Sequence, residues 1–316
     1  MPTPTLTDQT IRFKAAFLAP KYWPTWLLFG LIGLSASLPR PISIKIGDAI
    51  GVLYRKINHK RRRIVDINLK LCFPELDAQQ LNALAKDHFR FYGRSVIDLG
   101  LTWWASKKRL ARLIHFKNEH YYLDTLKQHN VILLLPHMTG LDCGAGYSAI
   151  LHPSITMMKL QKNELVNWRL WKGRTRLKPT RVIMRDQGLR PLIRAAKNGT
   201  TCYYMPDEDF GTSKLTTFAP FFSIQTSTLT TLSAMAKMAK AKVVPIYPIM
   251  LENGHYEVSF DKPLDSFPSD DALVDATRVN QAVEKCIMRA PAQYMWTLQW
   301  FKTRPEGEAS PYAPKA

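Results

Sequence analysis

The chain has 316 residues, and its 44 Lys and Arg against 25 Asp and Glu give a formal net charge of +19 at pH 7. With 46% hydrophobic residues it can bury a sizeable core, which excludes a largely disordered chain. The positive charge favours an anionic partner, which could be a phosphate-bearing polymer, an anionic lipid surface or an acidic protein. The four cysteines form no C-x-x-C pair, so we expect reduced, buried thiols rather than zinc or disulfide frameworks.

The first predicted element is an uncharged stretch from Tyr22 to Leu38, with basic residues on both sides. As a helix it would be about 25 Å long, slightly short of the roughly 30 Å hydrocarbon core of a bilayer. Because Trp23 and Trp26 stand at one end, where aromatic rings favour the membrane interface, we expect a membrane-anchor helix within residues 1–44. A cleaved secretory signal and a buried core helix remain the alternatives.

Residues 45–316 contain no linker, repeat or low-complexity tract and are predicted to form a single domain. A basic cluster between Arg55 and Arg63 opens this domain. It suits a solvated helix face, nucleic acid or lipid headgroups, and the apolar segment before it favours headgroups. Asp77 and Gln80 then have the spacing of a capping box, and apolar residues from 81 to 96 at spacings of 3 and 4 predict an amphipathic helix.

Beyond this helix, short apolar segments bounded by Pro, Gly or Asn alternate with helical patterns. This alternation is typical of an α/β fold with a central sheet covered by helices on both faces. The predicted strands lie at residues 131–135, 155–158, 182–184, 201–205, 243–249 and 256–260, and the clearest helices between and after them at 189–197, 226–240 and 271–288.

The strand at 131–135 leads directly into a candidate catalytic residue. Pro136 ends the strand, so His137 emerges at its carboxyl end, where open α/β sheets bind their ligands. If the backbone folds back at Gly140, the Asp142 carboxylate could bind one ring nitrogen and leave the other as a general base. The alternative is a structural histidine bound to backbone. Because the chain has no G-x-S-x-G motif, the base would activate a hydroxyl of the substrate, which implies group transfer to an alcohol.

Two charged segments are candidate binding sites. Arg169, Arg174 and Arg176 crowd a short stretch with interleaved tryptophans, and they could clamp phosphate or form an exposed basic face. Asp207 and Asp209 follow the strand at 201–205. A D-x-D at a strand end can hold the divalent ion of a nucleotide-sugar transferase, or it can pair with the arginines.

Several segments together resemble, in order, the lipid A late acyltransferases, which are Kdo-lipid IVA acyltransferases of the lysophospholipid acyltransferase-like superfamily. They are His137-x₄-Asp142, Gly173-Arg-Thr-Arg176, Pro206-Asp-Glu-Asp-Phe-Gly211 and the C-terminal segments at 284–288, 290–296 and 301–307. The resemblance implies a glycerolipid-acyltransferase-like fold with an N-terminal anchor, at the inner membrane with the catalytic domain on the cytoplasmic face. The chain departs from the family at Leu298-Gln-Trp300, where the family usually has His-Arg-Arg.

The resemblance implies transfer of a fatty acyl group from acyl-acyl-carrier-protein to a 3-hydroxyacyl chain on a phosphorylated glucosamine disaccharide. His137 would be the general base and Asp142 its orienting partner. No metal or cofactor is expected besides the acyl-carrier co-substrate, and the expected partners are acyl carrier protein, a phosphorylated lipid acceptor and an anionic membrane, without nucleic acid. The alternatives are a membrane-associated glycosyltransferase using Asp207 and Asp209, and a non-catalytic basic membrane-binding protein. The candidate substrate-binding residues are Arg169, Arg174, Arg176, Asp207, Asp209, Lys302 and Arg304.

Overall fold

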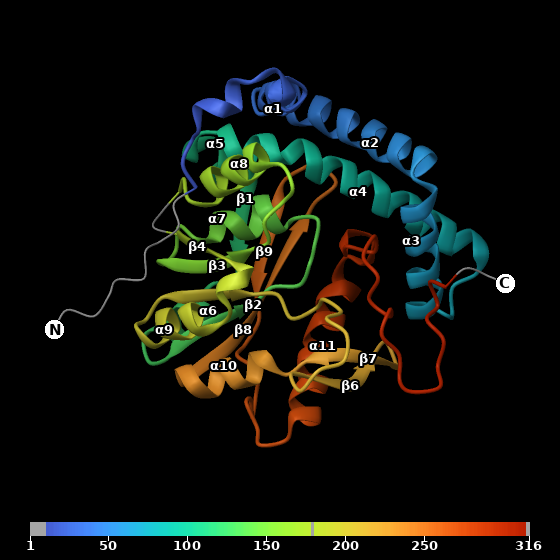
Figure 1. Cartoon of the computed structure of the whole chain (residues 1–316), viewed down its shortest axis with the longest axis vertical. Helices are drawn as coiled ribbons and strands as arrows, with labels where there is room; N and C mark the ends of the chain where they lie inside the picture. The colour runs from blue at the N-terminus through green and yellow to red at the C-terminus, as the bar shows by residue number, and fades with distance from the viewer. Residues whose placement is uncertain (1–10, 178–179, 314–316) are drawn as a thin grey trace.

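A seven-stranded sheet forms the centre of the computed structural model, which describes residues 11–177 and 180–313 (Figure 1). The strand order is β1-β9-β8-β2-β5-β3-β4, and every neighbouring pair is parallel except β8 with β9. The predicted α/β fold is therefore confirmed, with a mixed sheet. The strands are β1 (Ile114–Lys117), β2 (Asn130–Leu134), β3 (Ser154–Met158), β4 (Thr180–Met184), β5 (Thr201–Tyr204), β8 (Ala241–Met250) and β9 (Tyr256–Phe260).

Helices cover both faces of this sheet because its central strands bury side chains in both directions. Ile132 and Leu134 of β2 join one apolar cluster with α9, α10 and α11, whereas Val131 and Leu133 join a second with α5 and α6. A buried parallel strand is apolar on both faces for this reason. The helices are α1 (Trp23–Ser35), α2 (Arg40–Ile57), α3 (His59–Cys72), α4 (Ala78–Trp104), α5 (Lys107–Leu113), α6 (His120–Leu126), α7 (Gly146–Ser148), α8 (Glu164–Arg174), α9 (Arg190–Lys197), α10 (Thr231–Ala239) and α11 (Ala272–Arg289).

The predicted capping box begins α4, the longest helix of the described residues. The Asp77 carboxylate accepts a hydrogen bond from the Gln80 backbone N–H at 2.8 Å, and the Gln80 side chain accepts one from the Asp77 N–H at 2.9 Å. Both bonds satisfy N–H groups that the first turn of a helix leaves without partners. This part of the prediction is confirmed.

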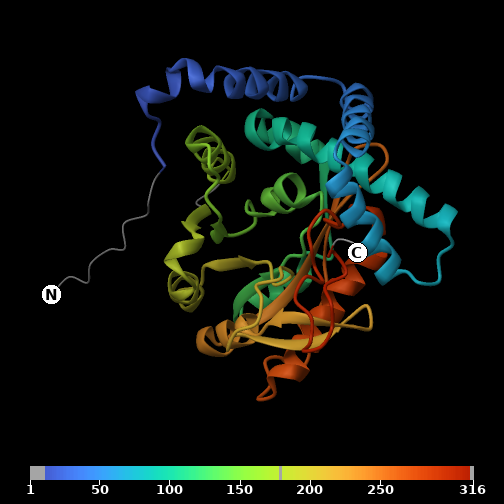
Figure 2. The same cartoon turned by 45° about the vertical axis from the view of Figure 1, so that its right-hand side comes forward.

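Helix α2 packs on α4 at backbone distance because glycines form the contact. A Cβ atom at Gly51 would lie 1.9 Å from the Phe89 carbonyl oxygen, and one at Gly93 would lie 2.1 Å from the Gly47 carbonyl oxygen. No larger residue fits these positions unless the helices move apart. In Figures 1 and 2, α1 and α2 follow one another along the same rim of the molecule, above α4.

The predicted N-terminal anchor corresponds to α1, which has 13 residues, fewer than the uncharged stretch that predicts it. Phe29 and Ile32 are buried in a cluster with Trp103 of α4 and Leu165 of α8, while much of the rest of α1 is exposed. Within residues 11–177 and 180–313, no helix has both the length and the apolar character required to cross a membrane. Residues 1–10 of the expected anchor region lie outside the described residues.

One predicted helix starts too early, because tertiary pairing decides where it begins. The helix expected at 226–240 begins only at Thr231, since residues 224–229 form β7 (Ile224–Leu229), which pairs antiparallel with β6 (Thr216–Phe221). Thr226 and Thr228 of this stretch are buried in the hairpin, and this context overrides the helical pattern. The prediction also missed β1. All four cysteines are free and buried, as expected: Cys72, Cys143, Cys202 and Cys286.

Candidate active site

Strands β2 and β5 bring His137 and Asp207 together. The two strands are parallel neighbours in which Leu134 is paired with Tyr204. His137 and Asp207 each stand three residues past this pair, so both side chains leave the same carboxyl edge of the sheet. This is the edge at which α/β sheets bind ligands.

The carboxylate of Asp207 holds the imidazole of His137 by two hydrogen bonds. Its Oδ1 lies 2.9 Å from His137 Nδ1, and its Oδ2 accepts the His137 backbone N–H at 2.8 Å. Asp207 is only 5% exposed, and His137 is 23% exposed. With Nδ1–H donating to the carboxylate, Nε2 keeps its lone pair and can accept a proton.

Burial on its own would lower the pKa of His137, but the charge and hydrogen bond of Asp207 outweigh it, and the pKa is raised above its ordinary value. Glu208 adds to the increase, while Arg174 opposes it. A raised pKa means that the neutral imidazole, which is the form able to act as a base, predominates only at higher pH.

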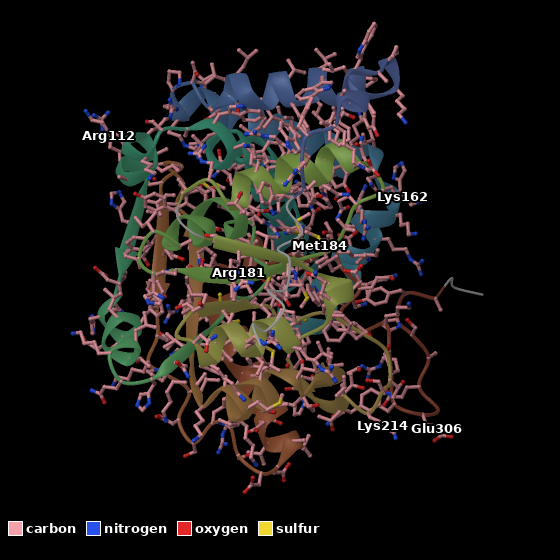
Figure 3. All side chains as sticks on the ribbon, turned by 60° about the vertical axis from the view of Figure 1, so that its left-hand side comes forward. Arg112, Lys162, Arg181, Met184, Lys214 and Glu306 are labelled. Atoms are coloured by element: carbon pink, nitrogen blue, oxygen red, sulfur yellow. The ribbon has the colours of Figure 1, made fainter. Side chains whose placement is uncertain are left out.

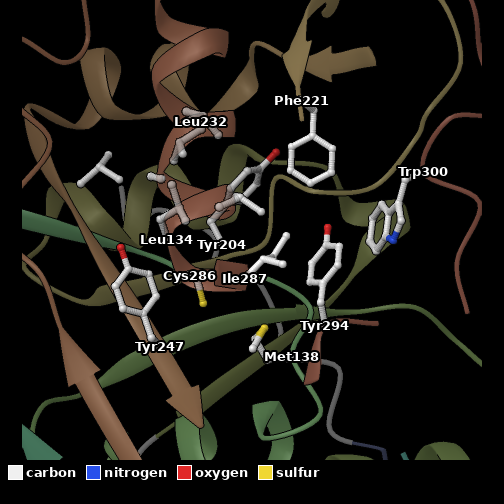
Figure 4. Packing of buried hydrophobic residues seen from close by; sticks show 14 of the residues in the cluster. Leu134, Met138, Tyr204, Phe221, Leu232, Tyr247, Cys286, Ile287, Tyr294 and Trp300 are labelled. Atoms are coloured by element: carbon white, nitrogen blue, oxygen red, sulfur yellow. The ribbon is translucent and has the colours of Figure 1, made fainter. Parts of the chain in front are cut away.

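The C-terminal segment holds the histidine from the other side. The carbonyl oxygen of His137 accepts the Met295 N–H at 2.9 Å, and the Thr139 N–H donates to the Gln293 carbonyl at 2.8 Å. Trp300 stacks on Tyr294 (Figure 4), with 5.0 Å between ring centroids. The Trp300 ring centroid lies 5.9 Å from that of His137. Trp300 therefore places a buried aromatic ring beside the imidazole.

His137 lines a cavity of about 590 Å³, which we call the His137 cavity. Its walls come from the carboxyl ends of β2, β3, β4 and β5 and from one face of α4. Besides His137 it is lined mostly by apolar side chains, with three cations and the carboxylates of Asp142 and Glu208. The residues of α4 that line it are Tyr92, Ser95, Val96 and Leu99, and the cationic ones are Lys159, Arg174 and Arg185.

A second, narrower cavity of about 60 Å³ adjoins the first, and we call it the inner cavity. Both cavities share a wall that includes Leu141, Asp142 and Arg174. Small residues such as Gly146 and Ala149 also line the inner cavity. A Cβ atom built on Gly146 would meet no atom nearer than 3.9 Å, so this position leaves room for a chain.

Asp142 binds Arg174 and not His137, which corrects the expectation that it orients the imidazole. Its Oδ1 accepts hydrogen bonds from Arg174 Nε at 3.2 Å and from the terminal nitrogen at 3.0 Å. The chain does bend at Gly140, but residues 141–145 then form a turn of π-helix whose first residues face α8, the helix that carries Arg174. The hydrogen-bonding role expected of Asp142 is filled by Asp207.

The three arginines of the expected phosphate clamp do not converge. Arg174 lines the His137 cavity, but Arg169 donates to the Trp103 carbonyl at 2.6 Å and Arg176 donates to the Ala105 carbonyl. Arg169 also stacks over the Trp104 ring at 3.8 Å. Cations that bind the last carbonyls of a helix stabilise its C-terminus, so Arg169 and Arg176 stabilise the C-terminal end of α4. Burial, with the charge of Arg176, lowers the pKa of Arg169 to about 10.

The remaining predicted residues support the C-terminal segment. Asp209 accepts hydrogen bonds from the Thr303 backbone N–H at 2.7 Å and from its hydroxyl at 2.8 Å, so the two carboxylates of the D-x-D serve different partners. Arg304 binds Glu308 at 2.6 Å and the Gln225 carbonyl at 2.5 Å. Lys302 is exposed. None of these three residues is among those that line the His137 cavity.

Sequence reasoning missed two cations of the His137 cavity, Lys159 and Arg185, which directly follow β3 and β4. Arg185 follows the carboxyl end of β4, binds Glu208 at 3.1 Å and covers the Phe210 ring at 4.2 Å. Its position directly after a predicted strand was the available signal, because such positions share an edge with His137.

Comparison with known proteins agrees with this geometry. The model of the bacterial lipid A biosynthesis acyltransferase family matches residues 10–303. The lipid A biosynthesis lauroyltransferase of Escherichia coli K12 is 35% identical over 95% of this chain and 98% of its own length. A lipid A biosynthesis acyltransferase of Haemophilus influenzae is 33% identical over 93% and 95%, and the palmitoleoyltransferase of E. coli K12 is 29% identical over 95% and 98%. The chain belongs to the bacterial lipid A biosynthesis acyltransferase family.

Proposed function

We propose that this chain transfers a fatty acyl group from acyl-acyl-carrier-protein to the hydroxyl of a 3-hydroxyacyl chain on a lipid A precursor of the Kdo-lipid IVA type. The observation that carries the proposal is the His137–Asp207 pair, held at the carboxyl edge of the sheet beside an apolar cavity. The enzyme would act at the cytoplasmic face of the inner membrane, where both substrates meet.

His137 is the general base of the proposed reaction. Its Nε2 takes the proton of the acceptor hydroxyl while the hydroxyl oxygen attacks the thioester carbonyl of the donor. Collapse of the tetrahedral intermediate breaks the carbon–sulfur bond, and the carrier thiolate leaves and takes up the proton from His137. Asp207 stabilises the imidazolium formed between these steps, because its carboxylate already accepts the Nδ1–H bond.

The two adjoining cavities suit the two chains of the reaction. The inner cavity is narrow and apolar, and it would receive the donor acyl chain with its thioester at the wall formed by Leu141 and Asp142. The wider His137 cavity would receive the hydroxyacyl chain of the acceptor. Burial of apolar chains contributes about 0.8 kcal/mol per methylene, which supplies the binding energy needed to place the reacting atoms.

Cations at the His137 cavity would bind the anionic groups of the substrates. Arg174 is already oriented by Asp142, and Arg185 by Glu208, so their remaining N–H groups can donate to phosphate or carboxylate oxygens. The net charge of +19 favours approach of an acidic carrier protein as well.

The test is acyl transfer by the purified protein. Acyl-carrier-protein thioesters and Kdo-lipid IVA in detergent micelles should yield a product heavier by one acyl group, detected by mass spectrometry. We expect His137→Ala to reduce turnover at least ~10²-fold. Wild-type turnover in His137→Ala, or a product that gains a sugar instead of an acyl group, would contradict the proposal.

A further inference from the structure

The rim above α4 presents an apolar surface that the catalytic site does not use. Helix α1 buries only one side, and Leu27 and Leu34 on its other side are 68% and 66% exposed. Figure 3 shows side chains from this rim projecting away from the rest of the protein. The exposed large apolar residues of α1 are Trp23, Leu27, Leu28, Leu31 and Leu34.

Helix α2 continues this surface with an apolar stripe along its length. Its glycines pack on α4. At 100° per residue the exposed stripe falls within an arc of about 80°, whose centre is roughly a third of a turn from that contact. The stripe extends over nearly the whole helix. It consists of Ile42, Ile46, Ile50, Leu53 and Ile57.

Positive charge accompanies the apolar surface. Residues 11–63 contain eleven Lys and Arg but a single carboxylate, Asp48, which already binds Arg90 and Arg94. Lys45 and Lys56 are exposed and, at helical spacing, lie about a quarter turn from the centre of the stripe. Among the described residues, no carboxylate pairs with either lysine.

We infer that the exposed faces of α1 and α2 form a platform that lies in the plane of an anionic lipid bilayer. Exposed apolar surface of this extent marks an interaction site, and the flanking cations identify an anionic lipid surface as the partner. In the plane of the bilayer, the α2 stripe enters the acyl region along its whole length while Lys45 and Lys56 remain at the headgroups. Residues spaced by four and three positions lie along one side of a helix, so they can all enter the acyl region only when the helix axis is parallel to the bilayer surface.

The platform places the His137 cavity next to the membrane. Gly93 of α4 contacts α2, whereas Tyr92 and Ser95 of the same helix line the cavity. Only the identity of the lipid that enters the His137 cavity rests on the proposed function. A lipid acceptor could then enter with its sugar and phosphate groups at the membrane surface.

Vesicle binding of the full chain tests the platform separately from catalysis. We expect wild type to co-sediment with vesicles of phosphatidylethanolamine and phosphatidylglycerol, and more weakly with phosphatidylcholine alone. Ile46→Glu with Ile50→Glu should reduce binding at least about tenfold, because two charges would enter the apolar layer. The matched control is Met238→Glu with Met288→Glu, which places the same charges on exposed methionines of α10 and α11 and should bind like wild type.

Acyl transfer in detergent micelles is measured on the same variants. Retained micellar activity with lost vesicle binding supports the platform and shows that the variant is folded. Vesicle binding by a wild type without acyl transfer would overturn the proposed function and leave the platform intact. Equal vesicle binding by both double variants would overturn the platform. The platform would also be overturned if the wild type self-associates without lipid and the Ile46→Glu, Ile50→Glu variant does not, since this face would then bind a second copy of the chain.

Depth measurements test the orientation. Nitroxide labels attached singly at positions 42, 46, 50, 53 and 57 should report similar, shallow depths in the bilayer by accessibility to oxygen. A depth that increases steadily along the helix, by about 1.5 Å per residue, would mean that α2 inserts end-on and would contradict the in-plane platform.

Discussion

Two carboxylates lie near the carboxyl edge of the sheet, and they differ in burial and in partner. Asp207 is 5% exposed and accepts two N–H groups of His137. Asp142 is 32% exposed and accepts two N–H groups of Arg174. Both pairs have similar distances, but only the Asp207 pair fixes a group that can gain and lose a proton near neutral pH.

The comparison separates catalysis from binding. A buried carboxylate raises the pKa of the imidazole and fixes its tautomer, so its loss should reduce turnover. A half-exposed carboxylate that orients a permanently charged guanidinium can only position that cation, so its loss should mainly weaken substrate binding. Substitutions at the two pairs test this difference.

The largest decrease in kcat is expected when the His137–Asp207 pair loses its imidazole. His137→Ala should reduce kcat by ~10² to 10⁴-fold, because no other side chain at this edge occupies the position of the imidazole. Turnover is measured with micellar acceptor, and circular dichroism checks the fold. His88→Ala is not a useful control, since His88 is fully buried and its Nδ1 donates a hydrogen bond to the Ala292 carbonyl oxygen. Exposed His59→Ala is suitable, and it should retain wild-type turnover.

Asp207→Asn should have the next largest effect. Asparagine has one acceptor oxygen, so one of the two His137 N–H groups would face the amide NH₂, and kcat should fall about 10²-fold. The pKa of His137 should fall as well, because the charge that raises it is lost. The acidic limb of the kcat/KM profile should therefore move to lower pH. The matched variant Asp142→Asn keeps an acceptor for Arg174 and should leave that limb and kcat nearly unchanged.

Arg174→Ala should raise the KM for the phosphorylated acceptor about tenfold, as expected when one charge-assisted hydrogen bond is lost. Since Arg174 lowers the pKa of His137, its removal should also move the acidic limb to higher pH, opposite to Asp207→Asn. Arg176→Ala is the comparison variant. Because Arg176 binds the Ala105 carbonyl, it should lower the melting temperature and leave KM as it is. A lower kcat with unchanged KM in Arg174→Ala would contradict the binding role.

The smallest effect concerns chain length. Gly146→Leu should fill part of the inner cavity without a backbone clash, because a Cβ there meets no atom within 3.9 Å. Each methylene that no longer fits loses about 0.8 kcal/mol, or about fourfold in kcat/KM. Competition between acyl donors of different length should show a shift to shorter chains. An unchanged preference, with an unchanged melting temperature, would mean that the donor chain lies elsewhere.

Much of the molecule could be predicted from local sequence. The capping box of α4 and the buried cysteines depend on neighbouring residues or on side-chain polarity alone. The same holds for the position of His137 after β2, since Pro136 ends the strand wherever the strand lies in the sheet. The boundary between β7 and α10 could not be predicted, because pairing of β7 with β6 overrides the helical pattern of residues 226–229.

Local sequence patterns were enough to predict an α/β sheet with His137 at its carboxyl edge, preceded by an apolar segment with basic residues on both sides. The tertiary structure decided which carboxylate holds the imidazole. Asp142 is only five residues from His137 along the chain, yet it does not bind the imidazole. Asp207 is 70 residues from His137 and binds it, because β5 is the neighbour of β2 and Leu134 is in register with Tyr204. Strand order depends on how all helices pack on both faces of the sheet, and no local pattern encodes it.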